Sequence, residues 1–254
     1  MKKKLFILLI SYFLIFIGHL YALEDITLKK QKWTFEGLFG RYDNASLQRG
    51  LQVYQEVCST CHGIKRLRFR ELKNLGFTET QIKEYAATFE ILDGPNEMGE
   101  LFMRPGEPSD TFISPYKNKE EATAAFGGAY PLDLSLITKA RKGGANYIYS
   151  LLTGYEENVP ENFNLGDGLY YNLYKDGRVI AMPPPIYDDA IEYIDGTNAS
   201  LHQLSYDIVN FLNWVAEPEL QKRKSLGLKV LIFLIVLTLL LYVTMKEIWS
   251  RIEK

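Results

Sequence analysis

The sequence is poor in cysteine and histidine. Among its 254 residues there are two cysteines, Cys58 and Cys61, and three histidines. Two cysteines three positions apart cannot cross-link a fold of this size, so a disulfide framework is excluded. The chain also lacks a strong net charge, since its formal value is −2. It has no internal repeat, phosphate-binding loop or basic stripe, and we therefore expect no nucleic-acid partner.

Apolar residues, in contrast, are abundant. They make up 47% of the chain, which is enough to bury a core and excludes wholesale disorder. The charged residues are segregated: residues 23–225 carry a net charge of −7, and the two ends together carry +5. This segregation indicates that the central part and the ends have different tasks.

The first 22 residues predict a secretory signal peptide. Three lysines stand before 13 uncharged, mostly apolar positions, and a small residue follows at Ala22. Basic, apolar and small-residue regions in this order are typical of a cleaved export signal. Leu20 fits poorly two residues before Ala22, so an uncleaved anchor is the alternative. In both cases residues 23–225 are expected to be exported.

Residues 226–245 predict a transmembrane helix. Lys229 is the only charge in this run of 20 residues, which at about 1.5 Å per residue covers the roughly 30 Å hydrocarbon core. A buried helix of a soluble protein is the alternative, but the run has no polar stripe to face water. Residues 246–254 then form a cytoplasmic tail. Basic residues on the outer flank oppose the positive-inside tendency, but long exported segments are largely insensitive to charge.

The motif at residues 58–62 carries the chemistry. Cys58-Ser59-Thr60-Cys61-His62 has the C-x-x-C-H pattern of covalent haem c attachment. Two thiols one turn apart can each add to a haem vinyl group, and His62 is then held against the iron as an axial ligand. Cys58 and Cys61 are thus the expected tethers of one haem.

Two other interpretations of the cysteine pair are a thioredoxin-like dithiol and half of a zinc site. The chain has no second ligand pair with the spacing of a zinc site. A dithiol leaves His62 without a role, and the βαβ pattern that accompanies such a dithiol is missing around the motif. Both interpretations are weaker than haem attachment.

Two amphipathic helices are expected to enclose the cofactor. Apolar residues recur at helical spacing before the motif and again before Pro218. The first set is Leu47, Leu51, Tyr54 and Cys58, and the second is Leu204, Ile208, Phe211 and Val215. Asn44 or Ser46 can cap the first helix. Gly50 would let the two helices approach closely.

The sixth iron ligand has few candidates. Met98, Met103 and Met182 are the methionines outside the signal and the anchor, and His202 is the other histidine of the exported domain. Met182 is favoured because three prolines follow it, and their fixed backbone angles stiffen the loop enough to hold a weak thioether bond. His202 and an open iron are the alternatives.

Taken together, these features resemble the cytochrome c1 family, the haem subunits of ubiquinol:cytochrome c reductase, also called the cytochrome bc1 complex. The resemblance is carried by Trp33, residues 37–43, Arg49 and Gly50, residues 58–63, 141–155 and 180–185, Glu217 and Pro218, and the single C-terminal anchor. It implies that Met182 is the sixth ligand. It also implies that Arg141 and Tyr147 approach the haem propionates, for which a guanidinium and a phenol are suitable partners.

The sequence departs from the family pattern in two loops. Leu132 stands where the family usually has a second proline, and residues 171–176 differ from the usual Asn-Pro-Tyr-Phe run. Residues 64–130 are too many for a simple c-type fold. We expect them to form an insertion that covers the haem edge and docks neighbouring subunits.

The expected fold is a mostly α-helical c-type haem domain with long loop insertions, plus one C-terminal transmembrane helix. By the resemblance it is not an enzyme on its own: it accepts single electrons from the Rieske iron-sulfur subunit and passes them to a cytochrome c in the respiratory chain. Its expected partners are cytochrome b and the Rieske subunit in a dimeric bc1 complex. Its expected place is the bacterial inner membrane, with the haem domain on the periplasmic side, or the equivalent membrane of an organelle.

Two other classes of function stay open at this point. A membrane-tethered haem peroxidase or reductase needs an open iron, whereas a Met/His iron has both positions filled and leaves no place for substrate. A thiol oxidoreductase needs no haem at all. Carbon monoxide binding to the reduced protein separates the first class from a carrier, and a pyridine haemochrome spectrum excludes the second.

Overall fold

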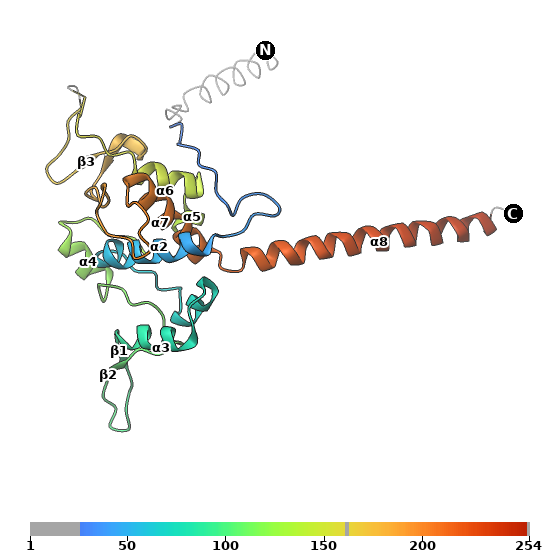
Figure 1. Cartoon of the computed structure of the whole chain (residues 1–254), viewed down its shortest axis with the longest axis horizontal. Coiled ribbons are helices and arrows are strands. Elements are labelled where there is room, and N and C mark those ends of the chain that lie inside the picture. Colours follow the sequence, from blue (N-terminus) through green and yellow to red (C-terminus); the bar gives the residue numbers. More distant parts are fainter. Residues whose placement is uncertain (1–25, 161–162, 253–254) are drawn as a thin grey trace, which may run out of the picture.

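The computed structural model describes residues 26–160 and 163–252, so the predicted signal peptide lies outside the described residues. This part of the chain forms a mainly helical body from which one long helix extends (Figure 1). The helices are α2 (Asn44–Glu56), α3 (Glu79–Ala87), α4 (Lys119–Ala125), α5 (Ile137–Ala140), α6 (Gly144–Leu152), α7 (Leu201–Ala216) and α8 (Leu220–Ile252). Three short 3₁₀ helices are η1 (Cys58–Thr60), η2 (Phe69–Leu75) and η3 (Asp176–Arg178). The strands form two antiparallel pairs, β1 (Glu90–Asp93) with β2 (Phe102–Pro105) and β3 (Tyr170–Tyr171) with β4 (Val179–Ile180).

Helices α2 and α7 cross at the centre of the fold (Figure 1). The predicted apolar stripes are confirmed by burial of Leu47, Leu51, Tyr54, Leu204, Ile208, Phe211 and Val215. Cys58, the last residue of the first predicted stripe, is partly buried and lies beyond the end of α2. Gly50 lies at the crossing, where an added Cβ would stand 2.2 Å from the carbonyl oxygen of Asp207. No side chain fits there, so the expected close approach of the two helices is confirmed.

The amino-terminal end of α2 is capped by Asp43, whose side chain accepts the N–H of Ala45 at 3.1 Å. The prediction of Asn44 or Ser46 as the cap is wrong. The hydroxyl of Ser46 is buried and donates instead to Asp207 on α7 at 2.6 Å. Ser46 therefore belongs to the contact between the helices and not to the helix end.

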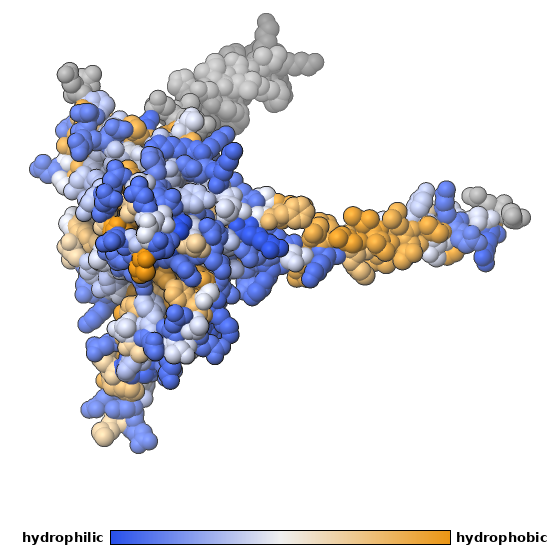
Figure 2. Space-filling model, in the orientation of Figure 1, coloured by the Kyte–Doolittle hydropathy of each residue, from blue (hydrophilic) through white to orange (hydrophobic). Residues whose placement is uncertain are grey.

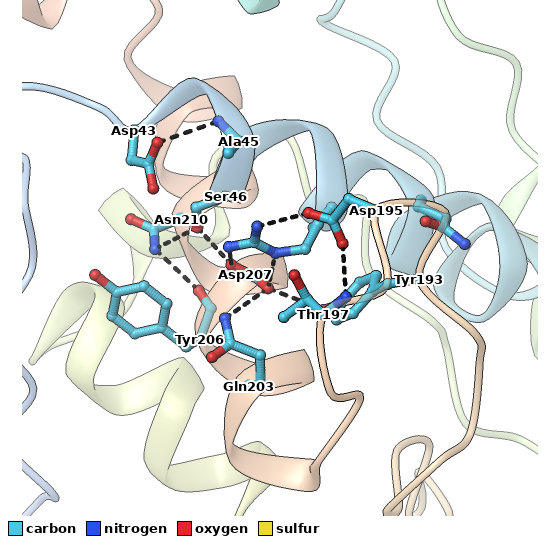
Figure 3. A network of polar contacts seen from close by, with 12 residues as sticks. Asp43, Ala45, Ser46, Tyr193, Asp195, Thr197, Gln203, Tyr206, Asp207 and Asn210 are labelled. Atoms are coloured by element: carbon cyan, nitrogen blue, oxygen red, sulfur yellow. Dashed lines mark hydrogen bonds and ion pairs between the residues drawn. The ribbon is translucent and has the colours of Figure 1, made fainter.

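A buried polar cluster joins α2 and α7 to the loop at residues 186–199 (Figure 3). At its centre is Asp207, whose side chain has no exposed surface. Arg49 donates from Nε to Asp207 at 2.8 Å and from Nη1 to Asp195 at 3.0 Å. The hydroxyl of Tyr193 also donates to Asp207, at 3.0 Å. These bonds hold the loop against both helices.

The insertion at residues 64–130 has secondary structure of its own. It contains η2, α3, the β1–β2 hairpin and α4 in that order. Figure 1 shows the hairpin reaching away from the α2–α7 crossing, on the opposite side of the body from α6. Aromatic rings pack together within the segment, with centroids 4.6 to 6.3 Å apart, from Phe69, Tyr85, Phe89 and Phe112. The insertion is therefore a partly helical lobe with an aromatic core.

Helix α8 begins at Leu220, whose side chain is 5% exposed, and then leaves the body (Figure 1). The predicted membrane span, residues 226–245, lies within it. Its most apolar stretch has a mean hydropathy of 2.7 and no buried residue, and Figure 2 shows apolar surface along the shaft. Within the described residues it is the one helix long and apolar enough to cross a bilayer.

Candidate functional site

The C-x-x-C-H motif follows directly from α2. The helix ends at Glu56, and the chain tightens into η1, where the N–H groups of Cys61 and His62 both donate to the carbonyl of Cys58, at 3.2 and 2.9 Å. This turn places two thiols and an imidazole on one short segment. The hydroxyl of Tyr54 donates to the carbonyl of His62 at 3.0 Å. The buried face of α2 therefore also holds the end of the motif.

The His62 ring is oriented by a contact with a distant part of the chain. Its Nδ1 lies 2.7 Å from the carbonyl oxygen of Leu132. A carbonyl only accepts, so Nδ1 carries the proton and Nε2 keeps a free lone pair. Burial lowers the pKa of His62, although the bond to Leu132 and the nearby Asp133 oppose this shift. A neutral imidazole with one nitrogen oriented by a backbone carbonyl is the form that ligates metals.

The segment at residues 131–135 runs alongside the residues that follow His62. The backbone N–H of Lys65 donates to the carboxylate of Asp133 at 2.9 Å, which ties the two segments together. This is the loop that departs from the family pattern at Leu132. Because its contact with His62 is made by a backbone carbonyl, a leucine there supplies the same acceptor as any other residue.

The thiols of Cys58 and Cys61 are free. Burial raises the pKa of the Cys58 thiol to about 12, and Cys61 adds to this shift. A redox dithiol needs a lowered thiol pKa, so this environment is unlike that of a thioredoxin. No three His, Cys, Asp or Glu side chains gather as a metal site within the described residues.

Met182 lies partly buried against the hydrophobic core. Its carbonyl accepts a hydrogen bond from the hydroxyl of Tyr155 at 3.0 Å. Strand β4 ends two residues before it, and the three prolines follow directly after it. The backbone at Met182 is therefore restrained by β4 before it, by the prolines after it and by the hydrogen bond from Tyr155.

The other candidate ligands lie elsewhere. Met98 and Met103 belong to the projecting hairpin and are 84% and 53% exposed. His202 lies exposed at the start of α7, with Nδ1 2.8 Å from the hydroxyl of Tyr149. Of the three methionines, only Met182 lies against the core.

Arg141 and Tyr147 lie on either side of a glycine turn. Arg141 follows the end of α5 and is exposed, whereas Tyr147 on α6 is partly buried. Gly143 between them has φ +89°, a conformation that favours glycine. Burial raises the pKa of Tyr147, and the nearby charge of Arg141 opposes that shift. No carboxylate pairs with Arg141 in the part of the chain that the structure describes.

Three of the six predicted site residues, Cys58, Tyr147 and Met182, lie partly buried against the same hydrophobic core. Sequence reasoning missed two groups that contact the predicted ligands, the carbonyl of Leu132 at His62 and the hydroxyl of Tyr155 at Met182. The Leu132 acceptor is a backbone carbonyl, so no pattern of side chains in the sequence could identify it. Tyr155 could have been noticed, because it ends the run at 141–155 that carries the resemblance.

Comparison with known proteins decides the family. The model of the Cytochrome C1 family matches residues 33–252. The chain belongs to the cytochrome c1 family. It is 50% identical over 245 residues to cytochrome c1 of Rhodospirillum rubrum, covering 90% of this chain and 89% of that protein.

Two further relatives of this cytochrome c1 family member have informative names. "Cytochrome b/c1" of Bradyrhizobium diazoefficiens is 43% identical over 240 residues, which are 86% of this chain and 35% of that longer protein. "Cytochrome b-c1 complex catalytic subunit, mitochondrial" of Candida albicans is 44% identical over 221 residues, which are 87% of this chain and 77% of that protein. Family membership confirms the predicted resemblance and the predicted fold class, a mostly helical protein with one apolar C-terminal helix.

The family implies a haem c, and the residues described above fit one. Two free thiols stand one turn apart, a neutral imidazole keeps Nε2 open, and a thioether lies at the margin of the core. These are the donors that covalent attachment and axial ligation of a haem require.

Proposed function

We propose that this chain accepts single electrons from a Rieske iron-sulfur subunit and passes them to a cytochrome c, as the haem-carrying subunit of a bc1 complex. The observation that carries the proposal is the His62 Nδ1 contact with the Leu132 carbonyl at 2.7 Å. It leaves Nε2 of a motif histidine ready to ligate iron, next to two free thiols. The chain is then an electron carrier and not an enzyme on its own.

One haem c is tethered by Cys58 and Cys61. Both thiols lie on a single turn, so each could add to a different vinyl group of the same haem and form one thioether bond. The hydrogen bonds that close this turn come from the backbone. Side chains add to these bonds: the hydroxyls of Ser59 and Thr60 donate to the carbonyls of Gln55 and Val57, at 2.7 and 2.8 Å.

His62 and Met182 would hold the iron. A haem held in this way supplies reversible one-electron chemistry, and a thioether ligand raises its reduction potential. Tyr155 keeps the Met182 loop in place through its hydrogen bond to the backbone. With His62 and Met182 as its ligands, the iron would have no open position for a substrate, which favours the carrier over a peroxidase or reductase.

Arg141 and Tyr147 hold the haem propionates. Arg141 has no carboxylate partner among the described residues, so its guanidinium is available for an anionic group. Tyr147 stands at the core margin beside it. Together they would hold a propionate, Arg141 by its charge and Tyr147 by a hydrogen bond from its hydroxyl.

The partners follow from the names of the relatives and from α8. A relative named cytochrome b/c1 and another named as a b-c1 complex subunit support assembly with cytochrome b. The proposed complex is dimeric and also holds the Rieske subunit, as the family resemblance implies. Helix α8 anchors the protein in the membrane. The haem domain, residues 23–225, then lies on the periplasmic side of a bacterial inner membrane or the equivalent side of a mitochondrial one, after removal of the signal at 1–22.

The haem attachment is tested on the full chain expressed with a haem c maturation system. A pyridine haemochrome spectrum should report one haem c per chain, and haem staining should persist on a denaturing gel. Cys58→Ala combined with Cys61→Ala should abolish the stain, whereas Ser59→Ala between them should keep it. Stained haem on the double variant would refute the attachment site.

The carrier role is tested by carbon monoxide and by electron transfer. The reduced wild-type protein should not bind carbon monoxide, and it should take an electron from a reduced Rieske protein and give it to oxidised cytochrome c. Carbon monoxide binding to the wild type would favour the enzyme instead.

A further inference from the structure

The loop before α2 has an apolar tip, formed by residues 37–40. Leu38 and Phe39 are 58% and 75% exposed. They lie between Gly37, with φ +72°, and Gly40, where an added Cβ would stand 1.9 Å from a backbone oxygen. Glycines on both sides make the turn tight. Two large apolar side chains are therefore presented at its end.

The base of this loop is firmly built into the domain. Trp33 and Phe35 are 4% and 7% exposed, and their rings stack at 5.6 Å. The N–H of Arg41 donates to the carbonyl of Thr34 at 2.9 Å, which closes the base. The tip thus projects outward from a well-packed base. The exposure of its side chains is therefore not a result of a poorly packed loop.

Lys224 fastens the tip to the foot of α8. Its Nζ donates to the carbonyls of Phe35 and Gly37, each at 2.6 Å, and to that of Gly40 at 3.5 Å. Figure 1 shows the loop before α2, in blue, extending from the body on the side from which α8 leaves. The tip therefore stands beside the first turns of the membrane helix.

The position of Lys224 along α8 gives the depth of the tip. With a rise of about 1.5 Å per residue, Lys224 lies roughly 3 Å outside Leu226, where the apolar run begins, and roughly 9 Å outside Val230. Val230 directly follows Lys229, the only charged residue of the run. The headgroup layer on each side of a bilayer is roughly 5 to 8 Å thick. A tip tied to Lys224 thus lies within the headgroup layer of the membrane that α8 enters.

We infer that residues 37–40 form a second membrane contact, in which Lys224 holds Leu38 and Phe39 at the boundary between lipid headgroups and acyl chains. Leucine and phenylalanine are residues that proteins insert at this depth. A single helix leaves a domain free to rotate about the helix axis. A second contact beside the helix fixes which face of the domain is turned to the membrane.

The test uses the full-length, haem-loaded protein in vesicles of phosphatidylcholine and phosphatidylglycerol. Phe39→Cys and, as the control, Met98→Cys are labelled with the same small fluorophore. Met98 is also an exposed apolar residue, at 84%, but it lies in the hairpin far from α8 (Figure 1). The unsubstituted chain, labelled in parallel, measures any reaction at Cys58 and Cys61.

Lipids with brominated acyl chains should quench the label at position 39 several-fold more than the label at position 98, and iodide in the water should do the reverse. Equal quenching by iodide at both positions would overturn the proposal, because the tip would lie in water. Protection of position 39 from both quenchers would also overturn it, because protein would then cover the tip.

The role of Lys224 is tested in the same labelled chain. Lys224→Gln should reduce quenching by brominated lipids at position 39. Lys222→Gln removes the same charge from a lysine that bonds only to Glu219 within the described residues, and it should leave the quenching unchanged. Unchanged quenching in Lys224→Gln would contradict the proposal that Lys224 holds the tip at the membrane.

Discussion

Arg49 on α2 and Asp207 on α7 form an ion pair across the central helix crossing, with Nε 2.8 Å from Oδ2 and with the Asp207 side chain fully buried. Further donors surround this carboxylate: Ser46, Tyr193 and Gln203 each donate to it, at 2.6 to 3.0 Å. A buried charge that is paired and fully hydrogen-bonded is tolerated, whereas one that loses its partner is costly. The helix before the motif therefore depends on a residue near the other end of the domain.

Removing the carboxylate should strongly destabilise the fold. Asp207→Ala leaves three donors without their acceptor and removes one of the two carboxylates that pair with Arg49, whose side chain is 15% exposed. We expect it to lower the free energy of unfolding by about 3 to 5 kcal/mol. Asp195→Ala, which removes the exposed partner of the same arginine, should cost less than about 1 kcal/mol. Urea denaturation followed by circular dichroism measures both. Equal losses would show that burial of the pair is not what matters.

The close approach of the helices should make Gly50 hard to replace. In Gly50→Ala the new methyl group meets the Asp207 carbonyl oxygen at 2.2 Å and the Cβ of Phe211 at 2.6 Å, so we expect a loss of about 3 kcal/mol or more from forced separation of the helices. Gly227→Ala is the control, because its Cβ would meet nothing within 4 Å. A Gly50→Ala protein as stable as the control would mean that the helices separate without cost.

The sequence predicted the parts of this fold that depend on local patterns. Helical spacing revealed both crossing helices, and the apolar run revealed the long C-terminal helix that could span a membrane. Asp207 could not be recognised as the partner of Arg49, because the two residues are 158 positions apart and neither differs in sequence from a surface charge. The same holds for Leu132, whose backbone orients His62 from 70 residues away. Contacts made by backbone atoms, or between charges far apart in the sequence, can be recognised only when the fold is known.

The hydroxyl of Tyr155 should stabilise the Met182 loop. Tyr155→Phe removes the 3.0 Å bond to the Met182 carbonyl, and a net loss of about 0.5 to 1.5 kcal/mol should raise the population of an open loop by roughly 2- to 12-fold. A small fraction of the reduced protein should then bind carbon monoxide. Tyr149→Phe, which removes a bond to His202 instead, is the control. Equal carbon monoxide binding in the two variants would show that the Tyr155 hydroxyl does not keep the Met182 loop in place.

Acidic residues in the loop after the proline run should attract a basic cytochrome c. Asp188 and Asp195 are engaged, the first by the N–H of Leu201 at 2.6 Å and the second by Arg49. Asp189 and Glu192 are exposed and are the residues to neutralise. Because a focused field raises encounter rates by a factor of about 10 to 1,000, Asp189→Asn with Glu192→Gln should slow reduction of the cytochrome several-fold at low salt.

The effect of this pair should fade as salt shortens the Debye length to about 8 Å near physiological ionic strength. Stopped-flow traces over a series of salt concentrations measure both the rate and its salt dependence. The matched control is Glu97→Gln with Glu100→Gln, which removes the same charge from the distal hairpin. If the control slows the reaction and the first pair does not, the docking site lies on the hairpin.

The central claim is that His62 and Met182 ligate the iron of one covalent haem c, and a redox titration of Met182→Leu tests it most directly. The variant should keep its stained haem, bind carbon monoxide when reduced, and show a large fall in reduction potential, because the thioether that favours the ferrous state is gone. Met103→Leu, a change of the same kind on the exposed hairpin, should behave like the wild type. An unchanged potential in Met182→Leu, with no carbon monoxide binding, would contradict the ligation and with it the proposed carrier.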